Sequence, residues 1–185
     1  IEKERQTQSK KRAEEFRCAL VGYTNAGKST LFNALTGSKV YIQDQLFATL
    51  DTTIRHLEIS ESHKVLLSDT VGFIRKLPHH LVASFRSTLK EVIEANLLLI
   101  LLDMSSPQII EHAETIENVL KDLDAQKIPT LFVLNKVDLI TDDNLVLKLQ
   151  RRFPDSVMIS AKSHLRLSEL KKRIGGLMEI EYETI

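Results

Sequence analysis

The sequence predicts an α/β fold with a mostly parallel six-stranded sheet and helices on both of its faces. Short apolar runs alternate along the chain with stretches of helical periodicity, which is the pattern of βαβ units. Several of these runs lack alternation between apolar and polar residues, as expected for strands buried on both faces. A glycine-containing motif at residues 22–29 follows the first apolar run and opens the first helical stretch.

Six apolar runs and five helical stretches make up the expected elements. The expected strands are Arg17–Val21, Arg55–Ile59, Val65–Leu67, Leu97–Leu102, Thr130–Leu134 and Val157–Ile159. The expected helices are Lys28–Leu35, Leu81–Ala95, Gln108–Leu123, Asn144–Arg152 and Leu167–Ile174. We expect the pair Gly175–Gly176 to end or fray the last helix. The stretch Gly37–Thr53 has no periodicity and predicts a loop, and loops of that length in compact domains are often functional.

The composition is that of a soluble globular protein. The 185 residues carry 25 Lys and Arg against 25 Asp and Glu, and 43% of them are hydrophobic. This excludes disorder throughout, and the zero net charge gives no general reason to expect nucleic-acid or membrane binding. Cys18 is the single cysteine, so no internal disulfide can form and a reducing compartment, the cytoplasm, is expected. Because the longest aliphatic run, Leu97–Leu102, is far shorter than the ~20 residues of a membrane helix, we expect no membrane partner. We also expect a monomer.

The strongest motif predicts a phosphate-binding loop. Residues 22–29, GYTNAGKS, fit the pattern G-x-x-x-x-G-K-[ST]. Backbone N–H groups in such a loop curl round a phosphate, and glycine permits the conformation and the close approach. Lys28 would supply charge to the β- and γ-phosphates, the Ser29 hydroxyl would bind Mg²⁺, and the next helix would point its positive end at the anion. The residues expected to contact the phosphates are Gly22, Tyr23, Thr24, Asn25, Ala26, Gly27, Lys28, Ser29 and Thr30.

A second motif, D-x-x-G, follows the expected strand Val65–Leu67. It consists of Asp69, Thr70, Val71 and Gly72. An acidic side chain at a strand end can hold Mg²⁺, usually through water, and the glycine N–H can reach a γ-phosphate. A turn would explain these residues equally well if they stood alone. Their place on a strand of their own, after the phosphate-binding loop, favours the metal site.

Two further motifs predict a guanine site. They consist of Asn135, Lys136, Val137 and Asp138 after one expected strand, and of Ser160, Ala161 and Lys162 after the next. The Asp138 carboxylate can accept hydrogen bonds from guanine N1–H and the 2-amino group, a donor pair that adenine lacks. Asn135 would tie this loop to the phosphate-binding loop, and the Lys136 stem would lie over the base. The N–H of Ala161 would reach the guanine 6-oxo group.

The chain is expected to have two parts. Residues 1–15 are almost wholly polar, with five basic and four acidic side chains. We expect them to be a linker or a helix end that leads from an upstream domain. Residues 16–185 are the expected GTP-binding domain.

The four motifs together resemble those of the guanine-nucleotide-binding domain of translation-factor-class GTPases. Five shorter segments narrow this to a resemblance to the HflX family: Phe47–Asp51, Thr70–Arg75, Leu77–Leu81, Ser84–Arg86 and Thr88–Glu91. The resemblance covers about residues 16–174, and the segment Phe73–Leu81 is its most family-specific part.

The resemblance implies a Ras-like P-loop GTPase fold and Mg²⁺-dependent hydrolysis of GTP to GDP and phosphate. It also implies binding to the large ribosomal subunit and its RNA, with a role in rescuing or splitting stalled ribosomes. By position, it makes Thr49 the loop threonine that reaches Mg²⁺ beside Ser29 and Asp69. The catalytic groups would be Lys28, Thr49 and Gly72. The first switch would be Phe47, Ala48, Thr49, Leu50 and Asp51, and the second would begin at Asp69–Gly72.

Three departures from the family pattern affect these assignments. The family usually has Leu-Asp-Pro-Thr where this chain has LDTT at residues 50–53, so Thr52 and Thr53 are alternative metal ligands and the first switch is less pre-organised. Arg166 stands where a glycine is common, which leaves the path of that loop open. Apart from residues 1–15, the sequence lacks the family's N-terminal domain and helical linker, so the chain is expected to be an excised G domain.

Two other functions remain open. The chain could be a nucleotide-gated binding module that hardly hydrolyses GTP. It could also be a GTPase of tRNA modification, of another RNA assembly process or of membrane iron transport, whose G domains share the first motif. The transport function requires membrane helices, and the tRNA function predicts a different sequence after DTVG than Phe73–Leu81.

Hydrolysis is expected to be slow without help. Phe73 occupies the position where Ras-like enzymes carry a water-orienting glutamine, and its side chain can neither donate nor accept a hydrogen bond. Arg55, the nearest arginine to the first loop, is expected to begin a strand. K⁺ held beside the phosphates through Asn25, or a group supplied by the ribosome, could compensate. Asn25 could instead merely tolerate a left-handed backbone.

The remaining polar residues carry weaker expectations. His79 and His80 have no partners at metal-ligand spacing and are expected in a solvated loop, and His112 is expected at the surface of a helix. A basic helix face is expected to be solvated or to contact RNA, and it consists of Arg166, Lys171, Lys172 and Arg173.

Overall fold

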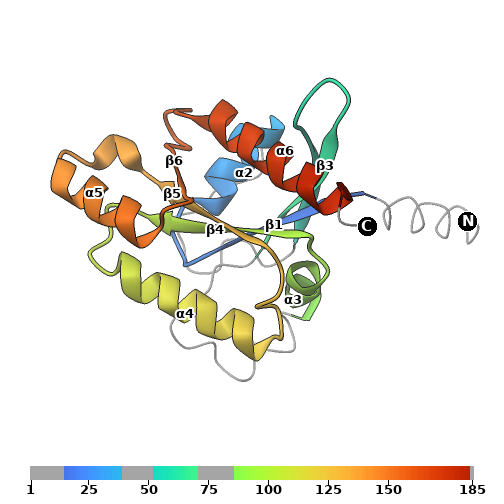
Figure 1. Ribbon diagram of the computed structural model, residues 1–185, viewed down its shortest axis with the longest axis horizontal. Helices are drawn as coiled ribbons and strands as arrows, with labels where there is room; N and C mark the ends of the chain where they lie inside the picture. Colours follow the sequence, from blue (N-terminus) through green and yellow to red (C-terminus); the bar gives the residue numbers. More distant parts are fainter. Residues whose placement is uncertain (1–14, 39–51, 71–85, 184–185) are drawn as a thin grey trace, which may run out of the picture.

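The computed structural model describes residues 15–38, 52–70 and 86–183, and these contain one six-stranded sheet (Figure 1). Its strands are β1 Arg17–Gly22, β2 Thr53–Glu58, β3 Lys64–Asp69, β4 Leu97–Asp103, β5 Thr130–Asn135 and β6 Val157–Met158. They lie in the order β2-β3-β1-β4-β5-β6, and among them β2 and β3 form the antiparallel pair while the other neighbours are parallel. The mostly parallel six-stranded sheet predicted from the sequence is therefore confirmed.

Helices cover both faces of the sheet. They are α2 Lys28–Thr36, α3 Arg86–Ile93, α4 Ile109–Asp122, α5 Asp143–Arg152 and α6 Leu167–Glu183, with a short 3₁₀ helix η2 at Val137–Leu139. Figure 1 shows α2 and α6 on one side of the sheet and α3 and α4 on the other. Leu149 of α5 belongs to the same hydrophobic cluster as the apolar residues of α4.

The central strands are apolar on both faces because each face packs against helices. In β1, Cys18 and Leu20 belong to the cluster that contains α2 and α6, whereas Ala19 and Val21 belong to the cluster that contains α3, α4 and α5. The aliphatic run of β4 divides between the two clusters in the same alternating way. This explains why these runs show no alternation in the sequence. Cys18 is buried and forms no disulfide.

The predicted end of the last helix is wrong. The helix α6 continues through Gly175 and Gly176 and ends at Glu183. A Cβ atom at position 175 would lie 2.9 Å from Cγ2 of Ile59, so the glycine allows the helix to pass close to this residue. Met178, one turn further on, is buried in the same core. Tertiary packing therefore outweighs the low helix propensity of two glycines.

The strand order reverses between β1 and β4. The chain passes from β1 to β3 on one side and then to β4 on the other, so the connections that leave β1 and β4 diverge. Ligands of such sheets bind where the strand order reverses in this way. Within the ranges given above, no helix has the length and apolar composition needed to cross a membrane.

Candidate functional site

The phosphate-binding loop (residues 22–29) is fitted closely against the ends of β4 and β5. A Cβ atom at Gly22 would lie 2.8 Å from the carbonyl oxygen of Leu101, which is backbone and cannot move aside. Gly27 has a φ of 98°, and a Cβ atom there would overlap Nδ2 of Asn135. Asn25 is also left-handed, with a φ of 65°. The two glycines of the motif are therefore required by space and by backbone conformation.

Lys28 and Asp69 form the charged part of the site. Lys28 begins α2, its side chain is buried, and its Nζ lies 3.5 Å from the Tyr23 carbonyl oxygen. Burial lowers the pKa of Lys28 from 10.5 to about 8, against the opposing effect of the Asp69 carboxylate. Asp69 is fully buried at the end of β3 and accepts a 2.7 Å hydrogen bond from the hydroxyl of Ser29.

The oxygen atoms of Ser29 and Asp69 suit a magnesium ion. A hydroxyl and a carboxylate oxygen are hard donors, and Mg²⁺ prefers such donors together with water and phosphate oxygens. The 2.7 Å hydrogen bond already brings the two groups together beside the phosphate-binding loop. Of the two alternative threonines, Thr53 faces Asp69 directly in the β2–β3 register, and Thr52 immediately precedes β2.

Part of the expected site cannot be placed. Outside the described residues lie Phe47, Ala48, Thr49, Leu50, Asp51, Val71, Gly72, Phe73, His79 and His80. The remaining residue of the D-x-x-G motif, Thr70, is buried, and its hydroxyl donates a hydrogen bond to the Leu20 carbonyl oxygen.

A single buried amide connects three loops. Nδ2 of Asn135 donates to the Ala26 carbonyl oxygen at 2.9 Å, and Oδ1 of Asn135 accepts from the Ala161 N–H at 3.0 Å. The expected link from Asn135 to the phosphate-binding loop is therefore present. The Ala161 N–H, which we assigned to the guanine 6-oxo group, is engaged by Asn135 in this structure. A buried N–H group needs an acceptor, so a guanine oxygen would have to share the Ala161 N–H with Oδ1 of Asn135 or replace Oδ1 as its acceptor.

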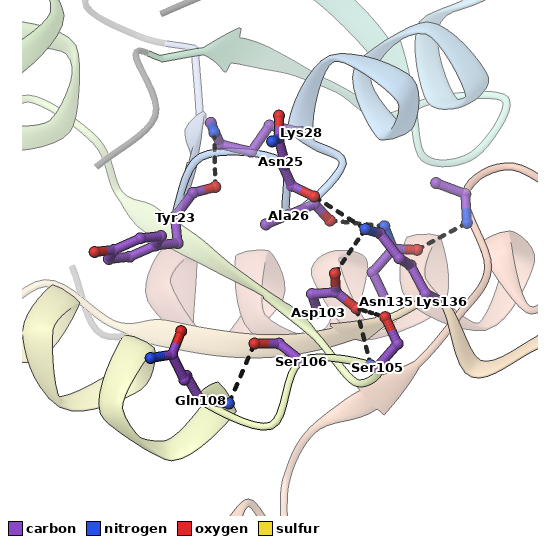
Figure 2. Close-up of polar contacts among 11 residues, drawn as sticks. Tyr23, Asn25, Ala26, Lys28, Asp103, Ser105, Ser106, Gln108, Asn135 and Lys136 are labelled. Carbon is purple, nitrogen blue, oxygen red and sulfur yellow. Dashed lines mark hydrogen bonds and ion pairs between the residues drawn. The ribbon is translucent and has the colours of Figure 1, made fainter. Parts of the chain in front are cut away.

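The side chain of Lys136 reaches both the phosphate-binding loop and the end of β4. Its Nζ lies 3.0 Å from the Asn25 carbonyl oxygen and 2.6 Å from Oδ2 of Asp103, as Figure 2 shows. Sequence reasoning placed the Lys136 stem over the base but missed Asp103. The available signal was an acidic residue at the carboxyl end of a strand that leads to the same edge of the sheet.

The other guanine-motif residues lie in the neighbouring loops. Asp138 is exposed in η2, and Lys162 is exposed after the buried Ser160, whose hydroxyl accepts a 3.1 Å hydrogen bond from the Ser163 N–H. Arg166, in place of the common glycine, has a φ of 57°. The loop therefore keeps a left-handed conformation at that position, held by the bridge between Ser160 and Leu165.

The phosphate-binding loop also contacts α4. The ring of Tyr23 stacks on the ring of His112, with centroids 3.9 Å apart and planes inclined by 10°. His112 is half-buried on α4, and its contact with the loop was not expected from the sequence. A helical residue cannot be matched to a distant loop by its periodicity, and the sequence carried no other sign of this contact. Thr24, Thr30 and Val137 are half-buried in the loop, in α2 and in η2.

Comparisons with known proteins agree with this arrangement. The sequence profile of the family described as "50S ribosome-binding GTPase" matches residues 17–136. A GTPase HflX of Gluconacetobacter diazotrophicus is 48% identical over 170 residues, which are 92% of this chain and 38% of that protein. The chain spans about two fifths of the length of the curated relatives it matches.

Solved structures show the same fold. A GTP-binding protein of the archaeon Sulfolobus solfataricus in complex with GDP has a TM-score of 0.70 and 30% identity, and the match covers 94% of this chain and 55% of that one. Era in complex with MgGDPNP and nucleotides 1506–1542 of 16S ribosomal RNA has a TM-score of 0.68 and 25% identity, and the match covers 86% and 55% of the two chains. The Ras-like fold expected from the resemblance is therefore confirmed.

Proposed function

Since the chain belongs to the family of 50S ribosome-binding GTPases, we propose that it binds GTP with Mg²⁺, hydrolyses it to GDP and phosphate, and acts as a switch on the large ribosomal subunit. In this proposal residues 16–185 are the GTP-binding domain, and residues 1–15 lead into it from an upstream domain. The 48% identity to a GTPase HflX supports the GTPase activity. A role in rescuing or splitting stalled ribosomes in the cytoplasm is part of the proposal.

The observation that carries the proposal is the position of Asn135. Its buried amide contacts the phosphate-binding loop through the Ala26 carbonyl and the loop after β6 through the Ala161 N–H. A phosphate site and a base site are thereby held at a fixed separation. This is the arrangement that a nucleoside triphosphate requires, because its base and its phosphates are covalently linked.

Each residue of the site has its own proposed role in nucleotide binding or hydrolysis. The Lys28 ammonium would contact the β- and γ-phosphates, and the N–H groups at the start of α2 would contact the phosphate oxygens. Ser29 and Asp69 would hold Mg²⁺, which would neutralise phosphate charge. Thr49 and the N–H of Gly72 are the proposed contacts to the γ-phosphate, and the loss of these contacts after hydrolysis relaxes both switches.

The proposed hydrolysis also needs a group that compensates for the water-orienting glutamine of Ras-like enzymes. Phe73 cannot orient the attacking water, so unassisted turnover is expected on the order of 10⁻⁴–10⁻² s⁻¹. We propose that K⁺ beside Asn25 or a group of the ribosome supplies the missing stabilisation. Asn25 is exposed in the phosphate-binding loop, where its side chain could contact a cation bound near the phosphates.

Turnover and sedimentation test this proposal together. GTP hydrolysis is measured in K⁺ and in Na⁺ at equal ionic strength, with and without large ribosomal subunits, and Lys28→Ala is the inactive control. We expect stimulation by the subunits, and co-sedimentation with them in a non-hydrolysable GTP analogue but not in GDP. Nucleotide-dependent sedimentation without any turnover would instead identify a nucleotide-gated binding module. A K⁺ effect that Asn25→Ala abolishes would assign the cation to that residue.

A further inference from the structure

Asp103 ends β4 and forms an ion pair with Lys136. The distance between Oδ2 of Asp103 and Nζ of Lys136 is 2.6 Å, and the two side chains are 18% and 31% exposed. Partial burial of this kind reduces screening by water, and a short charge-assisted hydrogen bond of this length is among the stronger polar contacts in proteins. The two residues lie 33 positions apart in the chain.

The Asp103 carboxylate is itself held in place. Its Oδ1 accepts hydrogen bonds from the Ser105 N–H at 2.9 Å and from the Ser105 hydroxyl at 2.6 Å. The Met104 N–H donates to the Asn135 carbonyl oxygen at 2.9 Å, which joins the end of β4 to the end of β5. Oδ1 of Asp103 therefore accepts hydrogen bonds from the loop after β4, and Oδ2 accepts one from Lys136, as Figure 2 shows.

A fixed partner matters for Lys136 because its side chain is long and its ammonium makes a second contact. The ammonium donates to the Asn25 carbonyl oxygen of the phosphate-binding loop at 3.0 Å. A lysine side chain loses much rotamer freedom when it is fixed. The Asp103 carboxylate stabilises the arrangement in which the Lys136 ammonium contacts the Asn25 carbonyl oxygen of the phosphate-binding loop.

We propose that Asp103 is a positioning residue of the nucleotide site: it fixes Lys136 so that the lysine closes the phosphate-binding loop and retains the bound guanine nucleotide. This proposal rests on the proposed function above. Asp103 acts through Lys136 and not through the base, so its loss should accelerate the release of GDP and GTP alike. The preference for guanine over xanthine, which depends on Asp138, should stay unchanged.

The test is a double-mutant cycle on the release of a fluorescent GDP derivative. The proteins are the wild type, Asp103→Asn, Lys136→Met and the double variant, with Asp122→Asn on the exposed end of α4 as a matched control. Asp103→Asn keeps the acceptor for Ser105 and removes the charge, and Lys136→Met keeps the apolar stem and removes the ammonium. We expect release about tenfold faster in Asp103→Asn, no further acceleration in the double variant over Lys136→Met, and no change in Asp122→Asn.

Other outcomes would overturn the proposal. If Asp103 acted only through its negative charge on the bound phosphates, Asp103→Asn would release GDP more slowly. If Asp103 served only the fold, the acceleration would persist in full in the Lys136→Met background. If Asp103→Asn did not fold, Ser105→Ala would test the same carboxylate. We expect release to be two- to threefold faster in Ser105→Ala, which is about half of the effect of one polar contact. Unchanged release would contradict the proposal. Failure of the wild type to bind GDP would overturn the proposed function as well, whereas normal binding with unchanged release in Asp103→Asn overturns this inference alone.

Discussion

Tyr23 of the phosphate-binding loop and His112 of α4 stack ring on ring, with their centroids 3.9 Å apart. The same loop is held on its other side by the side chains of Asn135 and Lys136, which donate to the carbonyl oxygens of Ala26 and Asn25. The loop is therefore held by side chains from two separate parts of the chain, α4 and the end of β5. Such pre-organisation lowers the cost of ordering the loop when phosphate enters.

Removal of the His112 ring should weaken nucleotide binding. A stacked aromatic pair is worth about 0.5–1.5 kcal/mol beyond the area it buries, so His112→Ala should reduce GDP affinity by about two- to tenfold. His112→Phe keeps a ring at the same position and is the matched control. Calorimetric titration with GDP measures both. Equal losses in His112→Ala and His112→Phe would show that the stacking itself contributes nothing.

The two neighbouring glycines of α6 should respond in opposite ways to alanine. Gly176 has nothing within 4 Å of an added Cβ, so Gly176→Ala should stabilise the fold by about 0.5–1 kcal/mol through helix propensity. Gly175→Ala gains the same propensity but pushes its Cβ to 2.9 Å from Cγ2 of Ile59, so it should not stabilise the fold. Urea unfolding of the two variants measures this difference. Equal stabilisation would mean that α6 does not pack closely on Ile59.

The stability of the nucleotide-free protein should rise between pH 8 and pH 10.5. The folded pKa of Lys28, about 8, lies below its ordinary value of 10.5 because of burial. Within this window the unfolded chain binds more protons than the folded chain, so the free energy of unfolding increases with pH. The destabilisation due to the buried charge is fully present below pH 8 and is lost above pH 10.5.

Comparison with Lys28→Met isolates this effect from other groups that titrate in the same range. Unfolding by urea is followed from pH 7.5 to pH 10.5 in both proteins without nucleotide. The wild type should gain stability relative to Lys28→Met as the pH rises. Parallel curves would contradict a buried, charged Lys28.

The parts of the molecule that could be predicted from the sequence are those governed by local patterns. The strand β4 could be predicted, over Leu97–Leu102, because a strand buried on both faces must be apolar throughout. The role of Lys28 could be predicted because phosphate binding requires its spacing from Gly22. The position of Asp103 at a strand end was a signal in the sequence, but its pairing with Lys136, 33 positions away, could not be predicted because two distant charges form no local pattern.

Two other differences have the same kind of cause. The helix α6 passes through Gly175 because its packing on Ile59 outweighs the local signal for termination. The Ala161 N–H contacts Asn135 because a buried donor takes the acceptor that the fold places nearest to it. Both depend on tertiary contacts that bring distant segments together, and no local pattern encodes them.

We propose that the loops after β5 and β6 select guanine, and the variant Asp138→Asn tests this selection. Asp138 is exposed in η2 and available to a base. The amide of the variant can accept only one of the two guanine donors, and its NH₂ group opposes the other. Affinities for GDP and xanthosine diphosphate are measured for both proteins. The account predicts that the wild type prefers GDP and that the variant loses at least about hundredfold in GDP affinity while it binds xanthosine diphosphate better than GDP. A variant that binds GDP like the wild type would contradict the account.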